Sequence, residues 1–175
     1  MNKHPLSSFH YCPKCGSESF HENNEKSKKC ATCGFVYYYN SSAAVVAVIE
    51  NEKGEILVAR RAKEPAKGML DLPGGFVDMY ETAEDAVRRE IMEETGLCIT
   101  AEQYLFSIAN IYRYSEFEVQ TVDLFFKCEV NVFNGLKADD DVMELQFISL
   151  DDLNPADFGL TSIRKGVEKL LQIVI

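Results

Sequence analysis

The chain has 175 residues, of which 46% are hydrophobic, so it can build one domain of ordinary size and a small appendage. Its net charge of −10 at pH 7 argues against a general polyanion-binding surface, because nucleic-acid affinity depends mainly on neutralising phosphates. The longest apolar run, residues 43–49, is far too short to span a bilayer, and the polar start resembles no secretory signal. We therefore expect a cytoplasmic protein without membrane contact, whose cysteines are reduced thiols or metal ligands.

The first predicted element is a small metal-binding module in residues 1–42. Two C-x2-C-G motifs, separated by 14 residues, present thiolates in a number and spacing that suit tetrahedral Zn²⁺. The four ligands are Cys12, Cys15, Cys30 and Cys33. The repeated motif resembles a zinc ribbon, in which the aromatic residues 35–39 would form a strand. A redox dithiol is the competing interpretation, although a single C-x2-C would suffice for that chemistry.

The remaining cysteines and the histidines carry little chemistry in this interpretation. His4, His10 and His21 all fall in the first module, and we expect them to be surface residues. Residues 43–175 contain no histidine, which excludes a histidine base or a Ser/His/Asp triad there. Cys98 and Cys128 lie among apolar residues and are expected to be buried thiols.

Strand and helix patterns alternate along the rest of the chain. After a short linker at 40–42, residues 43–50 and 55–61 predict two strands that form a hairpin. Further strands are predicted at 99–110, 119–130 and 145–149, and helical periodicity in 161–174 predicts a closing helix. This mixture favours a layered α/β or α+β domain over residues 43–175.

An acidic stretch lies between the second and third of these strands. On a helix, Glu90, Glu93 and Glu94 fall within an arc of about 100°. Glu90 and Glu94 stand at i,i+4 and repel each other, so the pair costs stability unless a cation lies between them. Mg²⁺ suits this position, because it prefers carboxylate oxygens and also bridges substrate phosphates. The competing interpretation is an acidic amphipathic helix without a metal.

The borders of this stretch have their own signals. Residues 72–75, Leu-Pro-Gly-Gly, predict a turn, and Thr82 or Glu81 would open a helix. Gly96 is placed to end that helix in a left-handed conformation. Arg89 lies one turn before Glu93 and can hold the carboxylates in position without taking part in the chemistry.

Residues 75–97 match the Nudix box, G-x5-E-x7-R-E-U-x-E-E-x-G-U with U a bulky aliphatic residue, at every fixed position. The chain therefore resembles the Nudix (MutT-like) hydrolases. The resemblance implies an α/β/α sandwich around a mixed sheet in residues 43–175. It also implies that water attacks phosphorus in a nucleoside diphosphate linked to another group, with Mg²⁺ or Mn²⁺ bound. Tyr80 departs from the common pattern, which has glycine before the first glutamate of the box.

The resemblance assigns roles position by position. It gives the metal to three carboxylates, those of Glu90, Glu93 and Glu94. Arg89 would orient these acids, with Glu93, Glu94 and Arg89 forming the centre of the catalytic machinery, and Glu81 would support the loop. The two glycines where the box begins, Gly74 and Gly75, would lend backbone groups near the metal and the pyrophosphate.

Residues outside the box are weaker candidates. In many relatives a later acid is a metal ligand or general base, and Asp141 or Glu144 would take that place, with a solvated acidic loop as the alternative. Arg60 and Arg61 precede the box and could contact substrate phosphates, although strand-end arginines are commonly surface residues. Tyr112 and Tyr114 lie where aromatic residues in some relatives stack on a base; core or surface tyrosines fit the pattern equally well. Tyr112 is the candidate substrate-binding residue of the two.

The substrate is less closely defined. A zinc ribbon before a Nudix domain resembles the NADH pyrophosphatases, but their S-Q-P-W-P-F-P signature is absent and the chain has no tryptophan. ADP-ribose hydrolases often carry a proline about 15 residues past the box, but this chain has Tyr112 at that position. We expect a dinucleotide or nucleotide-sugar type of substrate. The alternative is a nucleotide-sensing binding module whose ribbon docks protein or RNA, although stabilising the domain or a homodimer suits the ribbon better than nucleic-acid contact.

Overall fold

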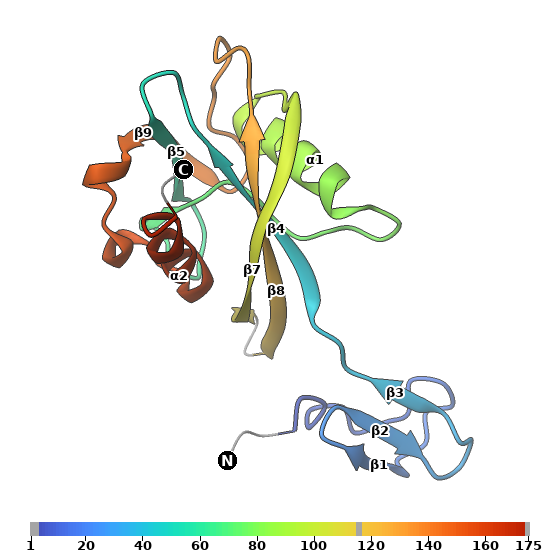
Figure 1. Cartoon of the computed structure of the whole chain (residues 1–175). Helices are drawn as coiled ribbons and strands as arrows, with labels where there is room; N and C mark the ends of the chain where they lie inside the picture. Colours follow the sequence, from blue (N-terminus) through green and yellow to red (C-terminus); the bar gives the residue numbers. More distant parts are fainter. Residues whose placement is uncertain (1–3, 115–116, 174–175) are drawn as a thin grey trace. The chain divides into compact units, whose positions relative to one another are not determined.

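The structure is a computed structural model that describes residues 4–114 and 117–173, with the side chain of Tyr114 outside the description. The chain forms two compact units, Met1–Ser41 and Ser42–Ile175 (Figure 1). This division lies one residue before the boundary expected from the sequence. Val174, which the helical pattern placed on the apolar face of the last helix, lies outside the described residues.

The small unit is an antiparallel three-stranded sheet. Its strands, in spatial order, are β1 (Phe20–Asn24), β2 (Ser27–Cys30) and β3 (Val36–Tyr38). The core consists of Cys12, Phe20 and Cys30, with Phe35 packed against it. Modules with so few buried side chains usually need a metal or a crosslink to stay folded.

The large unit carries the remaining elements. Its strands are β4 (Ser42–Ile49), β5 (Glu55–Arg61), β6 (Leu70–Asp71), β7 (Ala101–Tyr114), β8 (Phe117–Glu129) and β9 (Val142–Ser149). Its helices are α1 (Ala83–Thr95) and α2 (Thr161–Leu170), with short 3₁₀ turns η1 (Leu150–Asp152) and η2 (Pro155–Asp157) before α2. The expected strands and helices of this region are therefore present, with small shifts at their ends.

The strand pairing is mixed, as expected, but the predicted hairpin is wrong. β4 pairs in parallel with β8, which pairs antiparallel with β7, while β5 lies antiparallel between β6 and β9. Between β4 and β5 there is only an isolated bridge, Glu50 to Ile56. The two strands belong to different sheets: β4 pairs with β8, and β5 pairs with β6 and β9.

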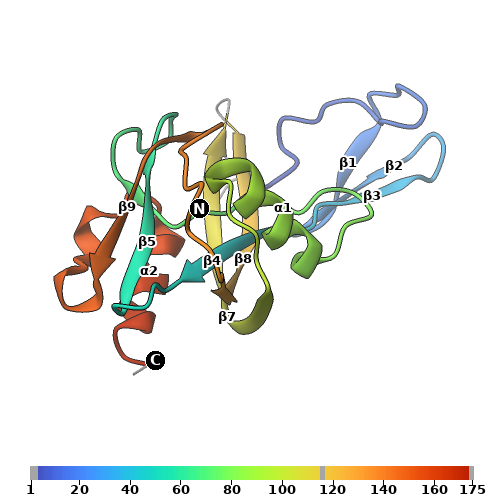
Figure 2. The same ribbon diagram turned by 90° about the horizontal axis from the view of Figure 1, so that it is seen from above.

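Alternate residues of β4 point into two separate cores. Val46 and Val48 pack with Val167 of α2, whereas Val45 packs with Ile91 of α1. The two helices therefore cover different sides of the strands, as Figures 1 and 2 show. This is an α/β/α sandwich, the fold class that the sequence predicted.

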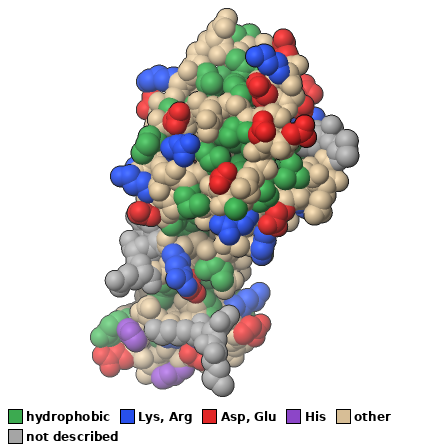
Figure 3. Space-filling model, turned by 90° about the vertical axis from the view of Figure 1, so that its left-hand side faces the viewer, with side chains coloured by type: hydrophobic (Ala, Val, Ile, Leu, Met, Phe, Trp, Pro, Cys, Tyr) green, Lys and Arg blue, Asp and Glu red, His purple; other side chains and the backbone are tan. Residues whose placement is uncertain are grey.

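The surface mixes charge types on the face that Figure 3 shows. Acidic, basic and apolar side chains are interspersed there, without a continuous basic area in that view. Within the described residues, no helix combines the length and apolar character needed to cross a membrane.

Candidate functional site

The acidic stretch lies on α1, whose ends are fixed by local chemistry. The Thr82 hydroxyl accepts a hydrogen bond from the backbone N–H of Asp85 at 3.1 Å and caps the first turn. Gly96 ends the helix with φ at 71°, a conformation that costs glycine no steric penalty. Val87 and Ile91 are fully buried against the sheet. Thr82 and Gly96 are the helix ends expected from the sequence.

Arg89 is the centre of a hydrogen-bond network at this site. Its Nε and Nη2 donate to the two carboxylate oxygens of Glu81 at 2.8 and 2.9 Å. Its Nη1 donates to Glu90 at 2.8 Å and to Glu93 at 3.1 Å, and its Nη2 also donates to the carbonyl of Phe76 at 3.0 Å. The bonds from Arg89 lower the pKa of the Glu81 carboxyl. Arg89 thus connects the loop to the helix through one rigid planar group.

Glu94 points the other way, toward the sheet, and is buried. Its side-chain carboxylate accepts a hydrogen bond from the backbone N–H of Gly74 at 2.9 Å. Burial raises the pKa of Glu94 to about 8, and the nearby charges of Glu90, Asp71 and Asp141 act in the same direction. Perturbed acids of this kind are typical of functional sites.

The predicted turn at residues 72–75 is instead an extended segment that runs beside β4. The backbone N–H of Ala47 donates to the carbonyl of Pro73 at 2.8 Å, and that of Val45 donates to Gly75 at the same distance. The Leu-Pro-Gly-Gly sequence predicts a turn because its residues favour turns. In the structure this segment instead packs closely against β4, which leaves no room for a side chain at Gly74.

The two glycines of this segment are needed for close approach. A Cβ on Gly74, whose φ is 148°, would lie 2.1 Å from the carbonyl oxygen of Val45. A Cβ on Gly75 would lie 2.5 Å from the carboxyl carbon of Glu90. Glycine therefore lets one backbone segment contact both the sheet and the acids of α1.

The carboxylates of α1 offer suitable donors for a hard divalent ion, in two groups. Arg89 holds Glu90 and Glu93, while Glu94 is bonded to Gly74. Among the described residues, only the four cysteines form a group of three or more potential metal ligands that lie close together. The three glutamates therefore do not converge on one point. Arg89 is the counter-ion of Glu90 and Glu93. Oxygen donors on one helical turn nevertheless match what Mg²⁺ and Mn²⁺ bind.

Glu94 also lines a cavity of about 180 Å³ inside the large unit. The cavity extends from Gly74 and Gly75 to the strands β4, β7 and β8. Arg61 and Asp71 line it as an ion pair, with the Nη1 of Arg61 donating to Asp71. Burial raises the pKa of the Asp71 carboxyl, although Arg61 opposes this effect. The side chain of Arg61 therefore lies in the cavity, but its charge is already paired.

The structure separates the two candidate acids that follow the box. Asp141 lines the same cavity as Glu94 and is paired with Lys63. Glu144 is exposed on β9 and forms an ion pair with Arg60 at 3.1 Å, outside the residues that line this cavity. Asp141 is thus near Glu94, whereas Glu144 and Arg60 are paired with each other at the surface.

The predicted residue Tyr112 lies edge-on to Phe76 with ring centroids 5.9 Å apart, and both rings line the cavity. Sequence reasoning missed three polar residues that also line it, Asn110, Thr121 and Asp123. A polar residue at a buried position of a strand is the signal that could have identified Asp123, which is 5% exposed.

Tyr80 adopts a backbone conformation that favours glycine. Its φ is 69° and its side chain is fully exposed. This explains physically why the family pattern has glycine at this position. The loop keeps its shape with tyrosine, at a cost in backbone strain.

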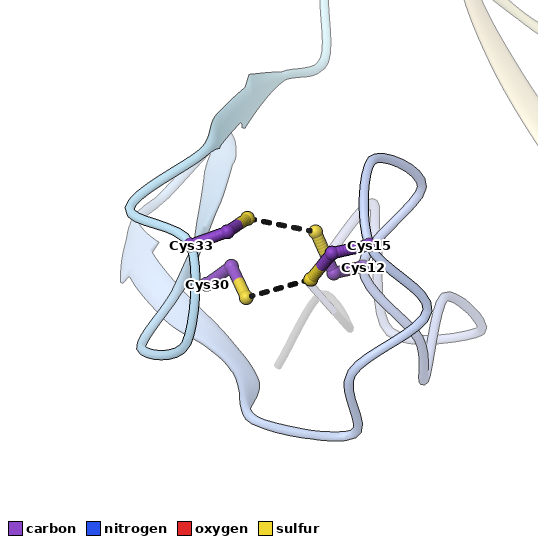
Figure 4. A group of neighbouring side chains, drawn as sticks. All are labelled: Cys12, Cys15, Cys30 and Cys33. Atoms are coloured by element: carbon purple, nitrogen blue, oxygen red, sulfur yellow. Dashed lines mark hydrogen bonds between the residues drawn. The ribbon is translucent and has the colours of Figure 1, made fainter.

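The four cysteines of the small unit form a compact cluster. The Sγ atoms of Cys12 and Cys33 are 3.7 Å apart, as are those of Cys15 and Cys30, and all four lie within 4.8 Å of one another (Figure 4). Four sulfurs at ~2.3 Å from a tetrahedral zinc ion would be separated by ~3.8 Å. A backbone hydrogen bond from Cys33 is the main cause that lowers the pKa of Cys30 to about 6. The pKa of Cys15 is raised to about 12, because its thiol neighbours outweigh a backbone hydrogen bond from Ser17, so the four thiols share their protons.

The remaining cysteines and histidines partly follow expectation. Cys128 is buried, and this burial raises its pKa to about 12. Cys98, expected to be buried, is exposed, because it lies just beyond α1, between the buried Leu97 and Ile99. His10 and His21 are exposed, as predicted.

Known proteins resemble this chain in both sequence and fold. It is 36% identical over 129 residues to the ADP-ribose pyrophosphatase of Methanocaldococcus jannaschii, which covers 73% of each chain. It is 32% identical over 104 residues to the NAD-capped RNA hydrolase NudC of Vibrio parahaemolyticus, covering 59% of this chain and 39% of that relative. The chain thus spans about two fifths of the length of the NudC relative. A NUDIX hydrolase from Nitrosomonas europaea shares the fold, with a TM-score of 0.72 at 20% identity over 93% and 90% of the two chains.

The family assignment rests on most of the large unit. The model of the NUDIX domain matches residues 40–170, which include β4, the box helix, the strands after it and α2. With the box acids, the fold and this match in agreement, the chain belongs to the NUDIX domain family.

Proposed function

We propose that this protein hydrolyses a pyrophosphate bond in a nucleoside diphosphate linked to another group, of the dinucleotide or nucleotide-sugar type. The observation that carries the proposal is the arrangement around α1. A buried acid, Glu94, lines a cavity beside a glycine segment, and Arg89 holds two more box acids, Glu90 and Glu93, on the same helix. Hydrolases of this type need clustered carboxylates and a shielded site for the reacting phosphate.

Glu90, Glu93 and Glu94 would hold Mg²⁺ or Mn²⁺ in this proposal. A bound divalent ion would neutralise phosphate charge and lower the pKa of the attacking water. Arg89 keeps Glu90 and Glu93 in place from the side of the loop. Glu94 must lose its proton before it can serve as a ligand, and the N–H of Gly74 favours that charged form.

Asp141 is our candidate for the acid that takes a proton from the attacking water, because it lines the cavity that Glu94 also lines. Glu144 is the alternative; each acid is paired with a basic residue, but Glu144 is not among the residues that line this cavity. Replacing each with its amide separates the two. We expect Asp141→Asn to lower kcat by at least ~10²-fold and Glu144→Gln to change it little. The opposite pattern would move the role to Glu144.

The substrate type is supported by the relatives. One is named an ADP-ribose pyrophosphatase and another an NAD-capped RNA hydrolase. Both names describe a nucleotide joined through a pyrophosphate to a second group. Arg61 and Tyr112, which line the cavity with Gly74 and Gly75, are the residues that we propose to contact such a substrate. Arg60 would contribute only if it left its partner Glu144.

For the small unit we propose a structural Zn²⁺ held by the four clustered cysteines. Four thiolates complete a tetrahedral set and leave no position open for catalysis. Thiolates persist where thiols stay reduced, so we place the protein in the cytoplasm. The ribbon would stabilise the protein or a homodimer.

The experiment that tests the activity is a screen in the presence of Mg²⁺, in which the phosphomonoesters formed by cleavage of the pyrophosphate bond are separated by chromatography. The substrates are NADH, ADP-ribose, dinucleoside polyphosphates, nucleoside triphosphates and NAD-capped RNA. We expect turnover of at least one of them, and a loss of at least ~10²-fold in Glu93→Gln. Glu84→Gln, an exposed acid on the same helix, is the matched control and should retain activity. Nucleotide binding without turnover that persists in Glu94→Gln would instead support a nucleotide-sensing module.

A further inference from the structure

The cavity beside the box contains a buried carboxylate that the proposed hydrolysis does not use. Asp123 lies on β8, is 5% exposed, and lines the cavity together with Glu94. The carboxylates of the box and Asp141 account for the metal and the proton transfer, so Asp123 needs a separate explanation. Buried acids normally carry a counter-ion or a full set of hydrogen bonds.

Asp123 has neither of these. Among the ion pairs within residues 4–114 and 117–173, none includes Asp123, whereas its neighbour Asp71 is paired with Arg61. One carboxylate oxygen of Asp123 accepts from the hydroxyl of Thr121 at 2.5 Å. The other accepts from the amide Nδ2 of Asn110 at 3.3 Å, which is long for a hydrogen bond. A carboxylate has about four acceptor positions, so this second oxygen can accept further bonds.

The walls of the cavity around Asp123 suit a flat ring. Phe76 and Tyr112 stand edge to face at one side, and Val46, Leu72 and Ile163 add apolar surface. At about 180 Å³ the cavity is smaller than the ~300–1,000 Å³ typical of sites for whole drug-sized ligands. It can therefore take one ring of a nucleotide while the phosphates lie nearer to Glu94.

A metal ion is a poorer occupant for this position. Within the described residues, Asp123 belongs to no group of three or more converging metal-type ligands. Its second oxygen instead accepts a hydrogen bond from the side-chain amide of Asn110, a group that has both donors and an acceptor. This combination matches a heteroaromatic edge on which an amino group stands next to a ring nitrogen.

We propose that Asp123, with Asn110, selects a purine that bears an exocyclic amino group, as adenine does. The free carboxylate oxygen accepts a hydrogen bond from the amino group, and Asn110 meets the adjacent ring nitrogen. A 6-oxo purine presents an oxygen at the same place, which an ionised carboxylate repels. This inference rests on the proposed function, because it places the nucleoside part of the same substrate.

The test compares ligands that differ only along this edge of the purine: adenine has an amino group beside an unprotonated N1, and hypoxanthine has an oxygen beside a protonated N1. For the wild-type protein we expect kcat/KM to be at least ~10-fold higher for ADP-ribose than for its hypoxanthine analogue, IDP-ribose. Binding of AMP and IMP, followed by calorimetry without added Mg²⁺, should show the same preference. This binding measurement needs neither turnover nor a variant that folds.

The matched variant is Asp123→Asn, which keeps the shape and replaces one acceptor oxygen by a donor. We expect its preference for ADP-ribose to fall toward unity, mainly through a higher KM for ADP-ribose with kcat little changed. Asp151→Asn, an exposed acid of η1, should keep the wild-type ratio.

The outcomes separate this inference from the activity itself. Hydrolysis of ADP-ribose and IDP-ribose at equal efficiency, or equal binding of AMP and IMP, would overturn the role of Asp123 and leave the proposed function intact. Preferential binding of AMP without hydrolysis of any substrate would support the base selection and remove the proposed hydrolysis.

Discussion

The guanidinium of Arg89 binds both carboxylate oxygens of Glu81, with Nε and Nη2 donating over 2.8 and 2.9 Å. Glu81 precedes α1 in the chain, and Arg89 lies in its middle, so this pair ties the loop to the helix. The same guanidinium reaches Glu90 and Glu93. The position of two candidate metal ligands therefore depends on a residue that need not touch the substrate.

Arg89→Lys is expected to disturb this arrangement while keeping its charge. A lysine has no planar fork and cannot bind Glu81, Glu90 and Glu93 together. We predict a decrease of several degrees in Tm and a kcat at least ~10-fold lower, measured by calorimetry and by the phosphomonoesters formed. Arg113→Lys, at an exposed ion pair on β7, is the control and should change neither. An unchanged kcat in Arg89→Lys would mean that the acids hold their positions without the fork.

The stability of the protein without added Mg²⁺ should depend on Glu94 between about pH 4.5 and 8. Burial raises the pKa of Glu94 to about 8, so in this range the folded state holds a proton that the unfolded state has lost. The stabilisation is complete below the unfolded pKa and is lost as the pH rises through the folded pKa. We predict that stability falls by about 2 kcal/mol from pH 6 to pH 8, since each pH unit costs ~1.4 kcal/mol well below the folded pKa and the slope falls to half at that pKa.

Urea denaturation of wild type and Glu94→Gln at pH 6, 7 and 8 measures this contribution. Glutamine cannot titrate, so the variant should lack the part of the pH dependence that Glu94 supplies. Glu84→Gln removes an exposed acid of the same helix and should follow the wild-type curve. Parallel curves for wild type and Glu94→Gln would show that the Glu94 carboxyl titrates near its ordinary pKa.

Tyr80→Gly should stabilise the protein. Tyr80 has a φ of 69°, which costs a residue with a Cβ about 1 kcal/mol more than glycine. Its side chain is fully exposed, so little packing is lost. We predict a gain of up to about 1 kcal/mol in the free energy of unfolding, measured by urea denaturation. Met79 is exposed and does not have a positive φ. Met79→Gly should therefore destabilise the protein, because glycine increases the conformational entropy of the unfolded chain.

Zinc binding by the small unit can be measured directly. We predict one Zn²⁺ per chain in the wild-type protein and its loss in Cys12→Ser, because three thiolates do not complete the tetrahedral set. Protease should then cleave residues 4–41 readily, while the large unit resists. The control Cys98→Ser changes an exposed cysteine outside the cluster and should keep the metal. Full zinc content and unchanged proteolysis in Cys12→Ser would remove the structural-zinc proposal.

Local patterns account for the elements that the sequence predicted correctly. Thr82 and Gly96 define α1 because capping depends on neighbours a few residues away. The hairpin of β4 and β5 was wrong because pairing between strands depends on distant partners, and β4 found β8. The turn at 72–75 was wrong for a similar reason: Gly74 packs against the backbone of β4, about 30 residues earlier in the sequence, and Gly75 packs against Glu90 of α1.

By itself, the sequence determined the family, the acids of the box and the cysteine cluster, because each is encoded at short, fixed spacing. Only the tertiary structure decided which later acid lies near Glu94, since Asp141 and Glu144 differ in location and not in type. It also brought Asp123 and Asn110, on neighbouring strands, into one cavity with Glu94. Substrate recognition is assembled from positions distant in the chain, and their proximity is created by strand pairing and helix packing.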